Sequence, residues 1–238
     1  MDAVLARAFE ETWPAAEHAD AGGFRVGRGL GGGGRVSSAR PIGVWAPDDI
    51  PAAEAIHRSW GQQPMFRLPD ADQDLAAALD AAGYRRETPT AVMQAPVAAL
   101  LSGRPIPFMA TFAIWPPLAI QRDIWAAGNI DPARQAVMDR VAVPRTAILG
   151  RIDDRAAGAA FAALSGDVVM VHAVEVLPAF RRRGLAGWLM RRAALWGQEQ
   201  GAARIGLAVS RANAGARAAW ERLGFVEAWG YAYYRRAV

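Results

Sequence analysis

Cysteine and lysine are both missing from the 238-residue chain. The lack of cysteine excludes a disulfide framework and any chemistry on a thiolate. Because there is no lysine, all 27 basic residues are arginines, which we ascribe to genome composition rather than to mechanism. These arginines are scattered among acidic residues, apart from the runs at 181–183 and 191–192. We therefore expect no nucleic-acid partner, and a nucleic-acid-binding module that uses the two runs is an alternative.

The chain also has no long hydrophobic run. Its longest uncharged stretch, Pro105 to Gln121, contains four prolines, which makes it a poor membrane helix. The segment from Met1 to Gly23 carries acidic residues and lacks the apolar stretch that a secretory signal needs. From these absences we expect a cytoplasmic protein with no membrane partner.

The composition that is present is that of a globular protein. Hydrophobic residues make up 53% of the chain and charged residues 21%, with a net charge of +4. A chain of 238 residues can form one large domain or two small ones. The apolar pattern predicts antiparallel strands followed by alternating strands and helices. We therefore predict an α/β (α+β) fold, with a mixed, mostly antiparallel central sheet that is flanked by helices.

Apolar periodicity places the individual elements. Helices are expected at residues 4–13, 52–60, 75–82, 118–127, 132–141, 184–200 and 212–223. Strands are expected near 43–45, at 65–68, 84–93, 108–114, 146–152, 158–164, 168–177 and 204–209, and from 225 onward. The glycine-rich run 27–34 is expected to form a mobile turn between strands, because it lacks the Gly-Lys-Ser/Thr of a phosphate-binding loop.

Proline and glycine in the stretch 95–107 mark the best linker candidate, which predicts two domains, 1–98 and 105–238. The halves carry a faint repeat. In each, a strand and a helix precede a glycine and an aromatic residue, Gly83-Tyr84 and Gly224-Phe225. Two similar domains in tandem would explain the repeat, and glycines that cap two unrelated helices are the alternative.

The segment from Val168 to Arg192 carries the chemistry. A β-rich stretch stops at Pro178, and a helix with an apolar stripe begins near Gly184. The first amides of a helix have no internal partner, and the helix dipole adds about half a positive charge there. Small residues let a phosphate approach these amides, and three arginines at 181–183 add counter-charge. The segment therefore predicts an anion-binding turn, although an exposed basic turn without a ligand fits the same residues.

The context of this turn resembles a known family. The turn reads Arg181-x-x-Gly184-x-Ala186, and it follows a Val-x-Val-x-Pro strand. Farther on, the chain reads Asn213-x-x-Ala216-x-x-Ala219-Trp220-Glu221-Arg222-Leu223-Gly224-Phe225. Both motifs, in this order, resemble those of the GNAT superfamily of N-acetyltransferases over residues 105 to 238. The N-terminal half looks like a degenerate copy that has lost cofactor binding, and an unrelated accessory domain is the alternative.

The resemblance implies a site for acetyl-CoA as co-substrate, with no metal. Val174 and Val176 are implied to pair with the pantetheine arm through their backbones, and Asn213 to contact the cofactor or fix the strands. Arg181 opens the motif. The remaining residues implied to bind, through loop amides at the pyrophosphate, are Arg182, Arg183, Gly184, Leu185, Ala186 and Gly187. The reaction implied is transfer of acetyl to a primary amine by direct attack.

His172 and Glu175 are the candidate bases. His172 lies two residues from Val174, so we expect both side chains on one face, where a related branch of the family carries a base histidine. Glu175 lies between valines on a strand expected to be buried, so its carboxylate needs a partner or a function. A core histidine and a salt-bridged glutamate are the respective alternatives.

Trp220 departs from the family pattern, since a tyrosine there often protonates the thiolate and an indole cannot. Its place on an apolar stripe favours core packing, and water or a tyrosine from 231–234 would then supply the proton. Trp45, Trp60, Trp115 and Trp125 are candidates for an acceptor pocket, against the commoner outcome of core packing. We predict an N-acetyltransferase with a small-molecule or peptide amine acceptor, as a monomer or homodimer, and a non-catalytic acyl-CoA-binding sensor is the alternative.

Overall fold

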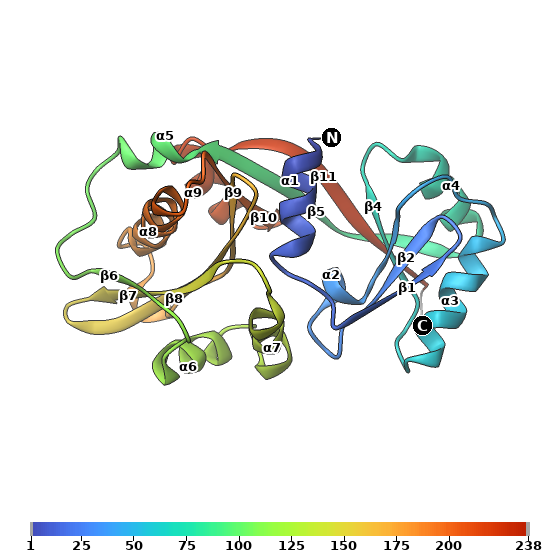
Figure 1. Cartoon of the computed structure of the whole chain (residues 1–238), viewed down its shortest axis with the longest axis horizontal. Helices are drawn as coiled ribbons and strands as arrows, with labels where there is room; N and C mark the ends of the chain where they lie inside the picture. Colours follow the sequence, from blue (N-terminus) through green and yellow to red (C-terminus); the bar gives the residue numbers. More distant parts are fainter. Residues whose placement is uncertain (1, 237–238) are drawn as a thin grey trace. The chain divides into compact units, whose positions relative to one another are not determined.

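A computed structural model describes residues 2–236, and its chain packs into two compact units (Figure 1). Unit 1 consists of Met1–Trp13, Val92–Val209 and Ala214–Ala228. Unit 2 consists of Pro14–Ala91, Ser210–Asn213 and Trp229–Val238. The two strands β5 (Tyr84–Pro96) and β11 (Val226–Arg236) each run through both units. The units therefore interleave along the chain, whereas the predicted domains 1–98 and 105–238 follow one another.

The sheet of unit 1 is mostly antiparallel. Its strands pair in the order β5-β10-β9-β8-β7-β6. The strands wholly or largely in this unit are β6 (Thr111–Ile114), β7 (Arg145–Ile152), β8 (Arg155–Ser165), β9 (Val168–Val176) and β10 (Arg204–Ser210). Neighbours from β6 to β9 pair antiparallel, and β9 and β10 pair parallel. Because a parallel pair needs a crossover, α8 (Leu185–Glu199) connects β9 to β10.

Helices cover both faces of this sheet. The remaining helices of unit 1 are α1 (Ala3–Glu11), α5 (Val97–Leu101), α6 (Ala119–Ala127), α7 (Pro132–Arg140) and α9 (Ala214–Arg222). Figure 1 shows α8 on one side of β7 and β8, with α6 and α7 on the other. This double cover explains why β8 is buried along nearly its whole length and is built largely from alanine.

Two strand glycines let α8 come close to the sheet. A Cβ added at Gly150 would lie 2.8 Å from a methyl group of Leu185, and one at Gly158 would lie 3.0 Å from its other methyl. Leu185 and Leu189 on α8 fill this space and are buried. Since Leu185 is the first residue of α8, the glycines set where the helix begins above the sheet.

The N-terminal helix α1 belongs to unit 1. Asp2 caps it by accepting hydrogen bonds from the amides of Val4 and Leu5, and it also pairs with Arg204 on β10. At the other end of the helix, Ser165 Oγ donates to Glu11 at 2.5 Å. These polar contacts, with the buried Leu5, Ala8 and Phe9, tie residues 2–13 to unit 1.

The sheet of unit 2 pairs in the order β1-β2-β3-β4-β11. Its strands are β1 (Glu17–Ala21), β2 (Phe24–Arg28), β3 (Ala39–Pro41) and β4 (Met65–Pro69), completed by part of β11. Its helices are α2 (Gly34–Ser37), α3 (Asp49–Ser59) and α4 (Gln73–Ala81). As in unit 1, the pairing is antiparallel except for one parallel pair, β3 with β4, which a helix connects.

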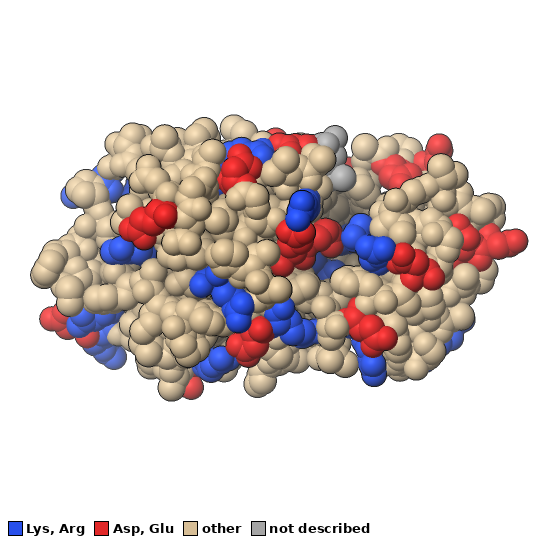
Figure 2. All heavy atoms as spheres, viewed as in Figure 1, with Lys and Arg blue, Asp and Glu red and all other residues tan. Residues whose placement is uncertain are grey.

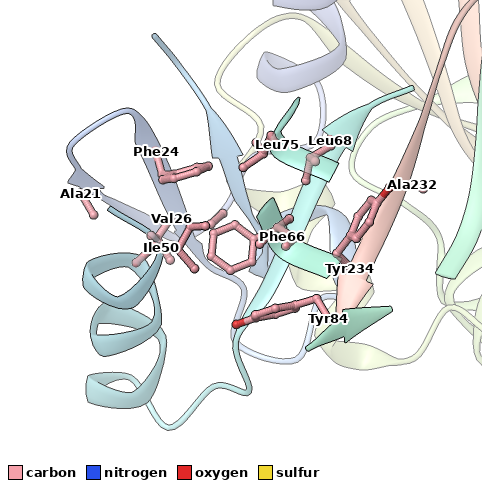
Figure 3. Close-up of a cluster of buried hydrophobic side chains, with 13 residues drawn as sticks. Ala21, Phe24, Val26, Ile50, Phe66, Leu68, Leu75, Tyr84, Ala232 and Tyr234 are labelled. Carbon is pink, nitrogen blue, oxygen red and sulfur yellow. The ribbon is translucent and has the colours of Figure 1, made fainter. Parts of the chain in front are cut away.

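Unit 2 has its own aromatic core, shown in Figure 3. Phe66 lies at its centre, with ring centroids 5.3 Å from Phe24 and 5.2 Å from Tyr84, both edge-on. The Tyr84 hydroxyl donates to the buried Glu54 at 2.8 Å. Burial raises the pKa of Tyr84 far above its usual value. Tyr234 from β11 completes this core, so the C-terminal strand is an integral part of unit 2.

The predicted fold class is confirmed, and the later elements lie close to their predicted positions. The strand expected near residues 43–45 was wrong, because the chain pairs at Ala39–Pro41 instead. The linker expected at 95–107 holds the end of β5 and helix α5. The hairpin β1–β2 was missed because its polar strand β1 lacks an apolar pattern. Among residues 2–236, no helix is both long and apolar enough to cross a bilayer.

Candidate active site

The parallel strands β9 and β10 separate at one end of unit 1. Their paired register runs from Arg204 opposite Val168 to Leu207 opposite Val171. Both strands continue beyond this point, to Val176 and Ser210 respectively. Since Leu177 N–H donates to Ala157 on β8, the N–H and C=O of Val176 face the opposite edge, toward the opening. The predicted residues Val174 and Val176 thus lie on the part of β9 beyond its paired register with β10.

A β-bulge shapes β9 just before this opening. Phe161 pairs with His172 and Ala159 with Glu175, so two residues, Ala173 and Val174, oppose Ala160 alone. Ala173 has a positive φ of 51°, which is uncommon for a residue other than glycine. The bulge brings His172 and Glu175 to one face of the sheet. The expectation that His172 and Val174 share a face was wrong, because it assumed regular alternation.

The turn that enters α8 has the conformation expected of an anion-binding loop. A short 3-10 helix, Pro178–Phe180, precedes it, and Phe180 is buried beneath it. Arg182 and Gly184 both have positive φ, 63° and 86°. Within the described chain, no side chain caps the amides of α8, and its first turn holds no acidic residue. The amides at the start of α8 are therefore available to an anionic ligand.

The space around Gly184 also leaves room for a ligand at the start of α8. A Cβ added there would meet nothing closer than the indole nitrogen of Trp188, at 3.9 Å. A pocket of about 310 Å³ adjoins the loop, lined in part by Arg183, Trp188 and the exposed Phe108. The loop is therefore open on this side.

The arginine runs have mixed surroundings. Arg183 forms a two-bond ion pair with Asp153, at 2.8 and 3.0 Å, which lowers the pKa of Asp153. Arg192 donates to Thr111 on β6 at 3.0 Å. Arginines and acidic residues also lie interspersed on the face shown in Figure 2. These contacts tie members of both runs to the protein itself.

Glu175 is held between a loop and an arginine. Its side chain is 15% exposed, and its Oε1 lies 3.2 Å from Nη2 of Arg181. On its other side is Gly128, at the end of α6, where an added Cβ would lie 2.4 Å from Glu175 Oε2. The same Arg181 donates through Nε to the carbonyl of Val176 at 2.9 Å. The carboxylate is thus partnered, as the salt-bridge alternative had it, and it lies beside the opening.

His172 has a defined hydrogen bond. Its Nε2 lies 2.9 Å from Oγ1 of Thr12, and that hydroxyl donates its only proton to the carbonyl of Ala8 at 2.6 Å. Nε2 must therefore carry a proton, which leaves Nδ1 as the basic nitrogen when the ring is neutral. The ring is 8% exposed and packs against Trp13 and Phe161. The contact with Thr12, 160 residues away in sequence, gave no sequence signal.

Trp125 holds the bulge. This fully buried side chain donates through Nε1 to the carbonyl of Ala173 at 2.8 Å. The sequence marked Trp125 as a candidate for an acceptor pocket, with core packing as the commoner outcome, and its full burial matches the latter. Trp115 lies beside Phe161, with ring centroids 5.8 Å apart, whereas Trp45 and Trp60 pack in unit 2. Of the four predicted tryptophans, two therefore lie in unit 1, near the bulged strand.

The remaining predicted residues lie away from the bulged strand and the turn into α8. Trp220 is 6% exposed and packs against Phe225, which matches the core role preferred for it. Asn213 belongs to unit 2 by its contacts, and its backbone N–H donates to the backbone carbonyl of Ser210. Tyr231 and Tyr234 are buried in unit 2, and the suggestion that a tyrosine of 231–234 supplies a proton stays a prediction.

Comparison with known proteins identifies the class to which this site belongs. Residues 110–225 match the family model "Acetyltransferase (GNAT) family". The segment is thus a GNAT acetyltransferase domain, as its two motifs predicted. A search of curated proteins found no match to the chain.

Solved structures resemble the whole chain. A GCN5-related N-acetyltransferase from Kribbella flavida is 18% identical, with a TM-score of 0.72 over 100% of this chain and 97% of that one. A putative GNAT acetyltransferase from Novosphingobium aromaticivorans is 19% identical, with a TM-score of 0.58 over 93% and 92%. A tandem GNAT protein from the clavulanic acid biosynthesis pathway is 14% identical, with a TM-score of 0.60 over 83% and 74%. At these identities the likeness shows the fold alone.

Proposed function

We propose that the protein transfers an acetyl group from acetyl-CoA to a primary amine of a small molecule or peptide. The observation that carries this proposal is the uncapped start of α8, which the 3-10 helix and the arginine-containing turn connect to the separated end of β9. The amides from Arg182 to Gly187 would hold the pyrophosphate, and arginine side chains would add counter-charge. The backbones of Val174 and Val176 would pair with the pantetheine arm. Asn213 stays a prediction of the sequence, as a residue that contacts the cofactor or fixes the strands.

Acetyl transfer needs an uncharged amine. The amine nitrogen attacks the thioester carbonyl, a C–N bond forms, the C–S bond breaks, and a proton leaves the nitrogen. Glu175 would take this proton, because it is the more exposed of the two candidates and lies next to the opening. His172 shares its face and is the second candidate, since an imidazole can accept a proton directly or through water. The departing thiolate would be protonated by water.

Isosteric variants test these roles. Glu175→Gln should lower kcat about 100-fold or more, as expected for loss of a general base, with little change in acetyl-CoA affinity. His172→Asn should have a smaller effect. Glu199→Gln, at the far end of α8, is the control and should retain full activity. The assay is thiol release from acetyl-CoA with a panel of primary amines. Full activity of Glu175→Gln would remove it as the base.

One observation favours a second function. Trp220 is buried where the family often has a tyrosine that protonates the thiolate. A chain without such an acid could bind acyl-CoA as a sensor and not turn it over. Tight binding of acetyl-CoA in calorimetry, with no thiol release for any amine in the panel, would support the sensor and contradict the enzyme.

A further inference from the structure

Arg181 contacts two groups that the proposed reaction needs. Its Nε donates to the carbonyl of Val176 at 2.9 Å, and its Nη2 lies 3.2 Å from Oε1 of Glu175. The carbonyl of Val176 faces the opening between β9 and β10, where an added strand would pair with it. Glu175 is the proposed base. One side chain therefore blocks a backbone acceptor and neutralises a carboxylate.

The position of Arg181 makes an alternative partner available. It is the first residue of the loop that leads into α8, and its side chain is 57% exposed. Because the guanidinium end of this ion pair is exposed, an anion of higher charge at the loop can compete with Glu175 for it. A pyrophosphate at the start of α8 would carry more negative charge than Glu175 and would offer a bidentate partner to the guanidinium.

We infer that Arg181 couples binding of the pyrophosphate to opening of the site, a proposal that rests on the proposed function. In the free protein Arg181 covers the Val176 carbonyl and pairs with Glu175. When the pyrophosphate draws the guanidinium away, the carbonyl becomes free for the pantetheine arm and the carboxylate becomes free to accept a proton.

Ligands with and without phosphates separate the two actions of Arg181. Acetyl-CoA carries the pyrophosphate, and S-acetylpantetheine has the same reactive arm without it. In the wild-type protein, S-acetylpantetheine must compete with Arg181 for the Val176 carbonyl. Arg181→Met keeps an unbranched side chain about as long as the aliphatic part of arginine and removes both contacts. Because Arg181 is mostly exposed, this variant should fold, and a melting curve checks that it does.

The expected changes in affinity have opposite signs. Arg181→Met should weaken acetyl-CoA binding about tenfold, through loss of a charge-assisted contact to phosphate. The same variant should bind S-acetylpantetheine about two- to fivefold more tightly, because the carbonyl is free. Arg183→Met is the matched control, since Arg183 pairs with Asp153 and not with Val176. It should bring no gain for S-acetylpantetheine.

A second measurement uses the wild-type protein. Inorganic pyrophosphate should increase the affinity for S-acetylpantetheine. By linkage, S-acetylpantetheine should increase the affinity for pyrophosphate by the same factor. This coupling should vanish in Arg181→Met. If the wild-type protein binds acetyl-CoA but Arg181→Met shows no gain and pyrophosphate no coupling, the inference is wrong while the proposed function stands. If the wild-type protein binds neither acetyl-CoA nor S-acetylpantetheine, the proposed function itself fails and the inference with it.

Discussion

The two units contain the same strand–loop–helix–strand arrangement with different chemistry at the start of the helix. In unit 1, β9 leads through arginines and Gly184 into α8, which has no capping side chain and no acid in its first turn. In unit 2, β3 leads into α3, whose first turn holds Asp49. The carboxylate of Asp49 accepts hydrogen bonds from the amides of Gly23 and Ala46, at 2.9 Å each.

This difference explains why one helix start suits a phosphate and the other does not. The first turn of α3 holds the carboxylate of Asp49, and its hydrogen bonds from the amides of Gly23 and Ala46 lower its pKa, which keeps it negatively charged. The adjacent Asp48 adds a second negative charge. The amides at α8 have arginines beside them instead. The same topology can therefore bind or exclude a phosphate, depending on which charge the chain places at the turn.

The largest expected effect tests the open helix start directly. Gly184→Glu should weaken acetyl-CoA binding by about 100-fold or more, because it forces a side chain into a left-handed conformation and adds a carboxylate at the amides. Calorimetry measures the affinity. Gly184→Asn, which tolerates positive φ and is neutral, should retain most of the binding. Unchanged affinity of Gly184→Glu would contradict the loop assignment.

The number of sites sharpens the comparison. Because Asp48 and Asp49 place negative charge at the start of α3, titration of the wild-type chain with acetyl-CoA should give one site per chain. The same titration that yields the affinity yields this number. Two equivalent sites would mean that unit 2 also binds the nucleotide, and the contrast between the two helix starts would then have no functional meaning.

An added methyl group should also affect stability differently at a glycine beneath α8 and at an exposed glycine of unit 2. A Cβ at Gly158 would lie 2.8 Å from the carbonyl of Glu175 and 3.0 Å from Leu185. Gly158→Ala should therefore reduce the free energy of unfolding by about 1–3 kcal/mol, as overpacking does. Gly43 in unit 2 has nothing within 4 Å of an added Cβ, so Gly43→Ala is the control and should be close to neutral. Equal stability of both variants in urea unfolding would show that α8 is not closely packed at Gly158.

The smallest expected effect concerns acid stability. Since the pKa of Asp49 is lower in the folded protein, the unfolded chain binds this proton more readily, and the stabilisation is lost as the pH falls below about 4. Asp49→Asn should lower the melting temperature by roughly a few degrees at pH 7 and by less near pH 3. Asp48→Asn, which removes no capping bond, is the control. A difference from wild type that stays constant between pH 7 and pH 3 would contradict this role.

Much of unit 1 was predictable, because its information is local. Spaced valines, Pro178 and the Arg181-x-x-Gly184-x-Ala186 turn predicted the strand, its end and the loop. Contacts between distant segments could not be predicted in this way. The hydrogen bond from His172 to Thr12 depends on α1 packing in unit 1, and the bulge at Ala173 depends on Trp125. Neither pair has a spacing that a local pattern reports.

By itself the sequence determined the class of fold, the order of the later elements and the residues of the turn entering α8, since local periodicity and backbone freedom act over a few residues. Only the tertiary structure decided that β5 and β11 each contribute to both units. It also decided that His172 and Glu175 share a face and that Arg181 covers Val176. Those outcomes depend on pairing register and on side-chain contacts between segments far apart in the chain, which no short stretch of residues specifies.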